Sequence, residues 1–187
     1  CNVTNHAETA EVFDKIVTER GTLDCLINNA GVAHVGNVLN TSEEDFDRVL
    51  SVNVKGVYNC LKAGVAHMTE RGGTIVNIAS TVSVMAIDDR FAYAASKAGM
   101  IGLTLSLAEA VAPDGVRVNA VAPGLIKTDI LTDVDQSVLD GLVEATPMKR
   151  IGQPEDIAGV VVFLLGDDSN FMTGQTLVAS GGRVTLP

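Results

Sequence analysis

The chain has 187 residues, of which 47% are apolar, and carries a formal net charge of −10 at pH 7. This length suffices for one domain with a sizeable core, and the apolar content excludes a disordered chain. The acidic charge argues against nucleic acids and anionic membrane surfaces as partners.

The first half of the chain contains two strand-like runs around a long helical stretch. Cys1–Arg20 is polar and charged, without the apolar core of a signal peptide. Leu23–Ile27 predicts a strand that ends at the Asn-Asn-Ala-Gly sequence of Asn28–Gly31. A Thr-Ser-Glu-Glu capping box predicts the start of a long helix over Ser42–Thr69. Thr74–Ala79 then predicts a second strand, of the kind buried in a parallel sheet.

The second half of the chain continues this alternation. We predict a long helix over Phe91–Val111, a third strand over Val116–Val121 that stops at Pro123-Gly124, a helix over Pro154–Leu165 and a last strand over Gln175–Ala179. Alternating strands and helices predict an α/β fold with a doubly wound parallel sheet covered on both faces. Such sheets bind ligands beyond the carboxyl ends of their strands.

Tyr93 and Lys97 suggest a site of proton transfer. Residues four apart share one face of a helix, and Ser80 follows the predicted strand that precedes this helix. A phenol titrates near pH ~10, and a neighbouring ammonium is expected to lower that pKa toward working pH. Tyr58 is the other tyrosine of the chain. Taken singly, the tyrosine reads as a half-buried helix residue and the lysine as a surface residue.

The remaining chemistry-bearing residues indicate neither disulfides nor a metal. The three cysteines, Cys1, Cys25 and Cys60, are scattered and lack CxxC spacing, which predicts free thiols in a reducing cytoplasm. The three histidines are isolated from one another, so we expect no metal site. The longest apolar stretch near the end, Val160–Leu165, is far too short to span a bilayer.

Five motifs together resemble the short-chain dehydrogenase/reductase family, single-domain type. They are Asn-Asn-Ala-Gly at residues 28–31, Asn53 within Ser-Val-Asn-Val, Ser80, Tyr93-x-x-x-Lys97, and Pro123-Gly124 followed by Thr128. The resemblance covers essentially all 187 residues as one domain. It implies a Rossmann-like fold, an NAD or NADP cofactor, and hydride transfer between nicotinamide and a small-molecule carbonyl or secondary alcohol. It also implies a cytoplasmic homotetramer assembled through the two long helices.

The resemblance implies a role for each catalytic residue. Tyr93 would be the general acid/base, and Lys97 would lower its pKa and hydrogen-bond the nicotinamide ribose. Ser80 would hold the carbonyl oxygen, with Thr81 and Ser83 as competing choices. Asn53 would kink its helix and hold a water linked to Lys97, although a solvent-facing polar residue is the ordinary alternative.

The resemblance also places the coenzyme and the substrate lid. The coenzyme would contact Asn2, Val3, Asn28, Ala30, Gly31, Tyr93, Lys97, Pro123, Gly124, Ile126 and Thr128. Ordinary turn roles would explain the loop members of this set equally well. Residues 125–150 would form a lid whose apolar side chains either line the substrate or pack on the domain. They are Ile130, Leu131, Val134, Leu139, Leu142 and Met148.

One departure from the family concerns the cofactor's phosphates. The family opens with a strand, a glycine-rich turn and a helix that hold the pyrophosphate, and no such pattern follows a strand at the start of this chain. Cys1–Thr4 resembles the end of the family's third strand, with Asn2 and Val3 facing the adenine. We therefore expect roughly 60 preceding residues, about two βαβ-sized pieces. Without them Leu23–Ile27 becomes an exposed edge strand, and the choice between NAD and NADP cannot be read.

Three functions compete. The first is a general alcohol dehydrogenase or carbonyl reductase, for which sugars, polyols and small secondary alcohols all remain open as substrates. The second is a 3-oxoacyl-(acyl-carrier-protein) reductase, which needs basic residues to dock an acidic carrier; Arg90, Lys127, Lys149 and Arg150 are available, although the net charge counts against it. The third is a non-catalytic nucleotide-binding or scaffold protein, against which the intact set of Ser80, Tyr93 and Lys97 speaks.

Overall fold

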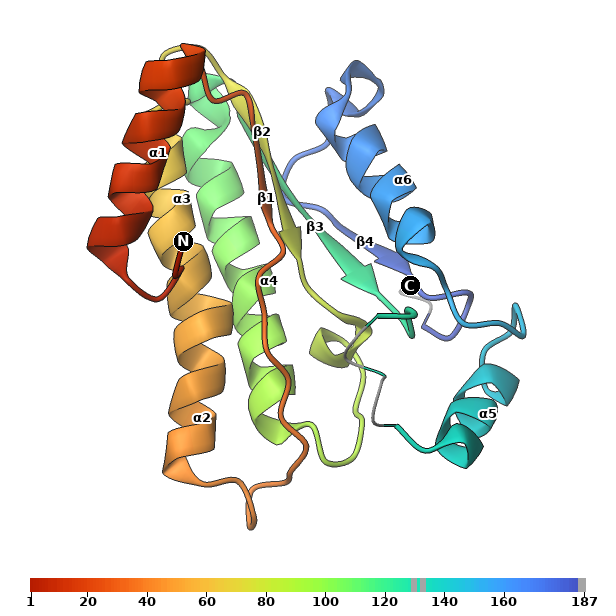
Figure 1. Cartoon of the computed structure of the whole chain (residues 1–187). Coiled ribbons are helices and arrows are strands. Elements are labelled where there is room, and N and C mark those ends of the chain that lie inside the picture. The colour runs from red at the N-terminus through yellow and green to blue at the C-terminus, as the bar shows by residue number, and fades with distance from the viewer. Residues whose placement is uncertain (129–130, 132–133, 185–187) are drawn as a thin grey trace.

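A single parallel sheet forms the centre of the computed structural model, which describes residues 1–128, 131 and 134–184 (Figure 1). Its strands lie in the order β1-β2-β3-β4. The bounds are β1 (Cys25–Asn28), β2 (Gly73–Ile78), β3 (Val116–Pro123) and β4 (Thr176–Ala179). Each neighbouring pair is parallel, so all four carboxyl ends meet at one edge of the sheet.

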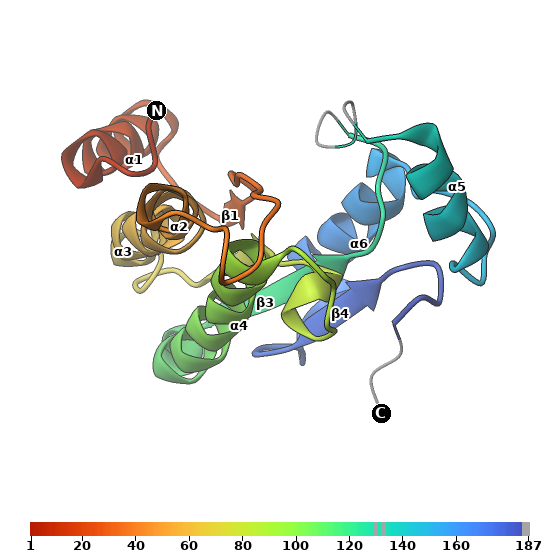
Figure 2. The same ribbon diagram turned by 90° about the horizontal axis from the view of Figure 1, so that it is seen from below.

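Helices cover both faces of this sheet, as the sequence predicts (Figures 1 and 2). On one face lie α1 (His6–Arg20), α2 (Glu43–Leu50), α3 (Val57–Ala66) and α4 (Phe91–Val111); on the other lies α6 (Pro154–Leu165). The short α5 (Gln136–Glu144) lies beyond the carboxyl ends of the strands. None of the helices in the described part of the chain is both long and apolar enough to cross a membrane.

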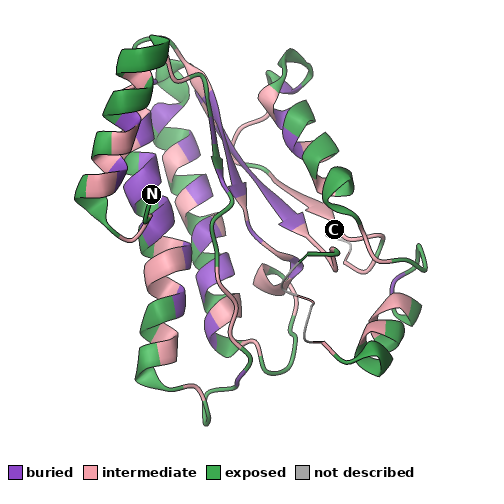
Figure 3. Ribbon diagram, viewed as in Figure 1, coloured by how far each residue is buried: buried purple, intermediate pink, exposed green. Residues whose placement is uncertain are grey.

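The core is divided by the sheet into two apolar layers (Figure 3). Successive side chains of β2 point to opposite faces. Ile75 therefore packs in the layer beneath α1, α3 and α4, and Val76 packs in the layer beneath α6. Both side chains are fully buried. The continuous apolar character of this strand thus reflects helices on both of its faces.

The predicted helices over Phe91–Val111 and Pro154–Leu165 agree with α4 and α6, and the four strands agree to within two residues. The helix α1 was not predicted. It buries only Thr9 and Phe13, so it lacks the apolar stripe by which a helix is recognised. Its boundary signals were nevertheless present. The Asn5 side chain caps the helix by accepting a hydrogen bond from the Glu8 amide, and Gly21 ends it with φ of 87°.

The strand β1 lies at the edge of the sheet formed by the described residues. Leu26 and Asn28 point into the core, whereas Cys25 and Ile27 are exposed on the opposite face. Ile27 keeps 46% of its surface accessible. This is the exposed apolar edge that the sequence predicts for this strand.

Candidate active site

Tyr93, Lys97 and Ser80 come together at the carboxyl end of the sheet. The first two lie in the opening turns of α4, and the Lys97 ammonium is 5.8 Å from the centre of the Tyr93 ring. Ser80 lies two residues beyond β2, where its oxygen caps a short 3₁₀ turn over Thr81–Ser83 by accepting a hydrogen bond from the Val82 amide at 3.4 Å. The hydroxyl proton of Ser80 is therefore free to donate elsewhere.

The two competing hydroxyls near Ser80 are less suitably placed. Thr81 is buried, and the Ser83 hydroxyl donates to the main-chain carbonyl of Ser80. The Ser80 side chain interacts with the phenol of Tyr93 and acts to lower its pKa. The geometry therefore favours Ser80 as the hydroxyl that accompanies the tyrosine.

Lys97 is a buried lysine, with 3% of its surface exposed. Its ammonium donates a hydrogen bond to the carbonyl of Ile78 at 2.7 Å, at the end of β2. Burial disfavours the charged form and lowers the pKa of Lys97 to about 8. The lysine is thus held at the end of β2 by this hydrogen bond, and its side chain loses its charge as the pH rises above about 8.

The Tyr93 phenol behaves differently from the expectation that its pKa is lowered. Burial raises the pKa of Tyr93, and the opposing effects of Ser80 and the Arg90 charge are smaller. The expected net lowering of this pKa is wrong for this structure, because burial of the phenol has the largest effect. Tyr93 is therefore a protonated phenol at neutral pH.

Asn53 lies in a break of the long helix predicted over Ser42–Thr69. Between α2 and α3 the chain forms a π-helix over Ser51–Gly56, a rare element that is often found at functional sites. The Asn53 side chain is fully buried and makes two hydrogen bonds to the backbone of Val32. It accepts one from the Val32 amide at 2.8 Å and donates one to the Val32 carbonyl at 2.9 Å. The regular helix is thus interrupted at Asn53, and the solvent-facing alternative is wrong.

Gly31 keeps a space open beside these residues. A Cβ atom at this position would lie 3.3 Å from the Asn53 oxygen and 3.5 Å from the Lys97 ammonium. The missing side chain lets polar groups on two helices face the same gap at the end of β1. A polar gap of this kind fits a ligand rich in hydroxyls, as a nucleotide ribose is.

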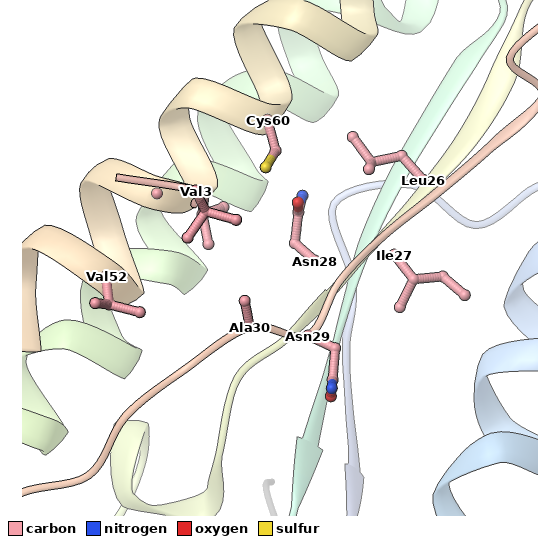
Figure 4. A pocket seen from close by; sticks show the side chains of 10 residues that line it. Val3, Leu26, Ile27, Asn28, Asn29, Ala30, Val52 and Cys60 are labelled. Atoms are coloured by element: carbon pink, nitrogen blue, oxygen red, sulfur yellow. The ribbon is translucent and has the colours of Figure 1, made fainter. Parts of the chain in front are cut away.

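A small pocket of ≈ 80 Å³ lies beside β1, where the adenosine side of the coenzyme is expected (Figure 4). It is lined by Val3, Leu26, Ile27, Asn28, Asn29, Ala30, Val52, Gly56, Val57 and Cys60. Three of the predicted contact residues, Val3, Asn28 and Ala30, thus belong to one pocket. Its apolar character fits a flat heterocycle such as adenine. Asn2 is exposed, and its side chain accepts hydrogen bonds from Thr4.

Several residues in this pocket or beside it are not predicted from the sequence. Asn59 of α3 is buried and donates to the carbonyl of Val3 at 2.8 Å, which holds the first residues of the chain against the helix. A Cβ at Gly56 would lie 2.7 Å from Val3, so a glycine is needed for this close approach. The four-residue spacing of Val52, Gly56 and Cys60 on one side of the helix was the available signal.

The expected nicotinamide side begins where β3 ends. Gly124 donates to the carbonyl of Ala179 at 2.9 Å, and a Cβ at Gly124 would lie 2.8 Å from the backbone of Ser180. Pro123 closes β3, Ile126 forms an isolated bridge with Gly152, and Thr128 is exposed.

The predicted lid is described only in part. A second pocket of ≈ 410 Å³ lies between its two ends and the end of β4. It is lined by Leu125, Ile126, Thr146, Met148, Arg150, Gly152, Asp156, Val178, Ala179, Ser180, Gly181, Gly182 and Val184. The helix α5 lies within residues 125–150, and Ile130 lies outside the described residues.

Comparisons with known proteins agree with this arrangement. A family model described as enoyl-(acyl carrier protein) reductase matches residues 1–183. A 3-oxoacyl-(acyl-carrier-protein) reductase from Thermotoga maritima is 40% identical over 184 residues, which cover 98% of this chain and 75% of the relative. A 3alpha-hydroxysteroid dehydrogenase from Mediterraneibacter gnavus is 37% identical over 176 residues, covering 94% of this chain and 70% of the relative.

Solved structures give the same result. A gluconate 5-dehydrogenase from Burkholderia cenocepacia, in complex with NADP and tartrate, superimposes with a TM-score of 0.95 at 32% identity. The match covers 98% of this chain and 73% of that one. A putative short-chain alcohol dehydrogenase from Sinorhizobium meliloti gives a TM-score of 0.92 at 35% identity, with 97% and 73% covered. The chain therefore belongs to the short-chain dehydrogenase/reductase family, oxidoreductases that act on CH–OH groups with NAD or NADP.

Proposed function

We propose that Tyr93 is the general acid/base of this oxidoreductase, assisted by Ser80, Lys97 and Asn53. The observation that carries the proposal is the meeting of a partly buried phenol, a hydroxyl and a buried ammonium at the carboxyl end of the sheet. A non-catalytic scaffold has no need of this costly combination of buried polar groups. No feature of the described residues favours that alternative.

In this proposal Tyr93 and Ser80 both act on the reacting oxygen of the substrate. The nicotinamide coenzyme, when bound, supplies a hydride to a carbonyl carbon or accepts one from an alcohol. During reduction the Tyr93 phenol donates its proton to the carbonyl oxygen, on which negative charge develops. The Ser80 hydroxyl donates a hydrogen bond to the same oxygen, and this bond strengthens as the charge grows. During oxidation the Tyr93 phenolate accepts the proton instead. Since burial raises the pKa of Tyr93, neutral pH favours reduction.

The coenzyme would be held by the residues around the small pocket and by the loop beyond β3. Val3, Ala30 and Val52 form an apolar surface for the adenine, and the polar gap at Gly31 would receive a ribose. Pro123, Gly124, Ile126 and Thr128 would surround the nicotinamide. NAD and NADP both remain candidates, although NADP is present in the structure of the gluconate 5-dehydrogenase.

A small carbonyl compound or secondary alcohol is the substrate that the charges support best. Of the four basic residues considered for docking an acidic carrier, Lys149 pairs with Glu144 at 2.8 Å and Arg150 pairs with Asp156 at 2.6 Å. Two of the four basic residues, Lys149 and Arg150, are therefore already paired with carboxylates of this chain. The 3-oxoacyl-(acyl-carrier-protein) reductase is the second candidate, because a relative with that name is 40% identical.

Steady-state assays of the full-length protein separate these two substrates. We expect it to turn over members of a panel of small ketones, diols and sugars with NADH or NADPH faster than acetoacetyl-CoA. Reduction should be insensitive to pH near neutrality, and oxidation should accelerate as the pH rises, because it needs the Tyr93 phenolate. Fast reduction of acetoacetyl-CoA alone would favour the carrier-linked substrate, and no activity in either direction would refute the proposed function.

We further propose that the protein is a cytoplasmic homotetramer in which α3 and α4 meet their copies. Tyr58 on α3 and Leu105 on α4 leave 48% and 54% of their surfaces exposed. The exposed side of α4 also carries small residues that permit close helix packing: Ala95, Ala98, Gly99 and Gly102.

Light scattering of Gly102→Arg tests the assembly. A side chain at Gly102 meets no atom of its own chain within 4 Å, so the fold should persist while the copies separate. Gly141→Arg on α5 is the matched control, since its position is equally open. We expect a tetramer mass for the wild type and for the control, and a smaller species for Gly102→Arg. A monomeric wild type contradicts the proposal.

A further inference from the structure

Two buried hydroxyls on the inner face of α4 make the same pair of hydrogen bonds. Ser96 accepts from the Asn53 amide nitrogen at 2.9 Å and donates to the carbonyl of Tyr93, one turn earlier, at 2.8 Å. Thr104 accepts from the Asn77 amide nitrogen at 2.9 Å and donates to the carbonyl of Met100, again one turn earlier, at 2.9 Å. Ser96 and Thr104 and their two asparagine partners are all fully buried.

The two pairs differ in the further hydrogen bonds that each asparagine makes. Asn77 belongs to β2 and accepts from the Asn28 side chain at 2.8 Å, so the Thr104 pair joins α4 to two strands of the sheet. Asn53 lies in the π-helix and holds both backbone polar groups of Val32. The Ser96 pair therefore joins α4 to the loop that follows β1.

This loop is the part of the site where α4 and the expected coenzyme contacts approach each other. Gly31, next to Val32, lies against both Asn53 and Lys97, since a Cβ there would come within 3.5 Å of either. The carbonyl that receives the Ser96 proton belongs to Tyr93 itself. A chain of hydrogen bonds thus runs from the turn of the catalytic tyrosine through Ser96 and Asn53 to the backbone beside Gly31.

We propose that Ser96 is a positioning residue that, through Asn53, fixes the distance between the Tyr93–Lys97 turn of α4 and the Gly31–Val32 loop. This role rests on the proposed function of Tyr93. Without the Ser96 oxygen, one N–H of the Asn53 amide has no acceptor in a fully buried place. The two bonds to Val32 still set the orientation of the amide, so the protein folds while the loop moves relative to α4.

The experiment compares Ser96→Ala with Thr104→Val in the full-length protein. Each variant removes one buried hydroxyl and the same two hydrogen bonds, so both should lower the melting temperature by similar amounts. We expect kcat to fall on the order of 10-fold to 10²-fold for Ser96→Ala, because small displacements of reacting groups have effects of this size. We expect Thr104→Val to stay within about 2-fold of the wild type, since it leaves the loop in place.

Two further measurements exclude a merely structural effect. In an Asn53→Ala background, Ser96→Ala should lower kcat no further, because the residue acts through that amide. Ser96→Thr retains the hydroxyl and should restore most of the lost kcat. An equal loss of kcat in Ser96→Ala and Thr104→Val, or additive effects with Asn53→Ala, would overturn the proposal.

Hydrogen exchange at the Val32 amide gives a readout that does not depend on activity. We expect exchange to accelerate on the order of 10-fold in Ser96→Ala, where the acceptor of this amide is loosened, and to stay unchanged in Thr104→Val. An inactive wild type would refute the proposed function, whereas this exchange would still decide whether Ser96 holds the loop. Equal exchange in the wild type and in Ser96→Ala rules out the positioning role.

Discussion

Tyr93→Phe should lower kcat on the order of 10²-fold to 10⁴-fold while the coenzyme continues to bind. Positioned general acid/base groups contribute this much to a rate, and phenylalanine removes the transferable proton but keeps the ring. The aromatic surface beside Lys97 is therefore preserved. Turnover should be measured in both directions, and coenzyme binding should be followed by the quenching or enhancement of its fluorescence.

Tyr58→Phe is the matched control for this variant. Tyr58 is the other tyrosine of the chain and lies half-exposed on α3. The same loss of one hydroxyl there should leave kcat and coenzyme binding close to those of the wild type. If Tyr93→Phe retained full turnover, the proton would have to come from another group, and the assignment of Tyr93 would be wrong.

Lys97→Met should reduce activity on the order of 10²-fold and yet make the protein more stable at neutral pH. Methionine fills a similar volume without a charge. A lysine whose pKa is lowered from 10.5 to about 8 carries a burial cost of roughly 3.5 kcal/mol while it is charged, at ~1.4 kcal/mol per pKa unit. Losing the hydrogen bond to the Ile78 carbonyl offsets about 1–3 kcal/mol of that gain.

The stability difference between Lys97→Met and the wild type should depend on pH with a definite sign. Between about 8 and 10.5, folded Lys97 has lost its proton whereas unfolded Lys97 keeps it. The unfolded state then binds more protons, so the free energy of unfolding of the wild type rises with pH relative to the variant. Below pH 8 both states are charged and the difference is constant. The advantage of the variant should therefore shrink as the solution becomes alkaline.

Urea unfolding at a series of pH values measures this difference. Taking the difference between Lys97→Met and the wild type cancels the contributions of Cys25 and Cys60, whose pKa values are raised in the folded protein. Lys15→Met provides the control, because Lys15 is an exposed residue of α1. A Lys97→Met protein whose stability tracks the wild type at every pH would show that the ammonium is well solvated.

The sequence predicted the sheet and most helices because their apolar patterns are local. The run over residues 74–79 is apolar on both faces, and α4 is a long segment of mostly small and apolar residues without a proline, so each is recognisable alone. Neither α1 nor α5 was predicted as a defined helix; α1 is held at its ends by caps and buries few side chains. For such a helix the boundary residues carry more information than the hydrophobic pattern.

The positions of site residues could be predicted where they belong to one sequence motif. Their pKa values could not, because these depend on how deeply each side chain is buried. Tyr93 and Lys97 lie one helical turn apart, so their proximity follows from spacing. The direction of the Tyr93 pKa shift depends on how much protein covers the phenol, which no spacing reveals. The partnership of Ser96 with Asn53 joins residues 43 positions apart, and it emerges only when two helices are packed together.

The π-helix between α2 and α3 changes the direction in which the side chains after it point around the axis of the long helix. In a regular α-helix, Val49 and Val57 would be rotated by about 80° from each other, since eight residues exceed two turns of 3.6. Here Val49, Asn53 and Val57 are all buried. A single amide therefore lies between two buried valines of the same helix, and the regular α-helix resumes at Val57.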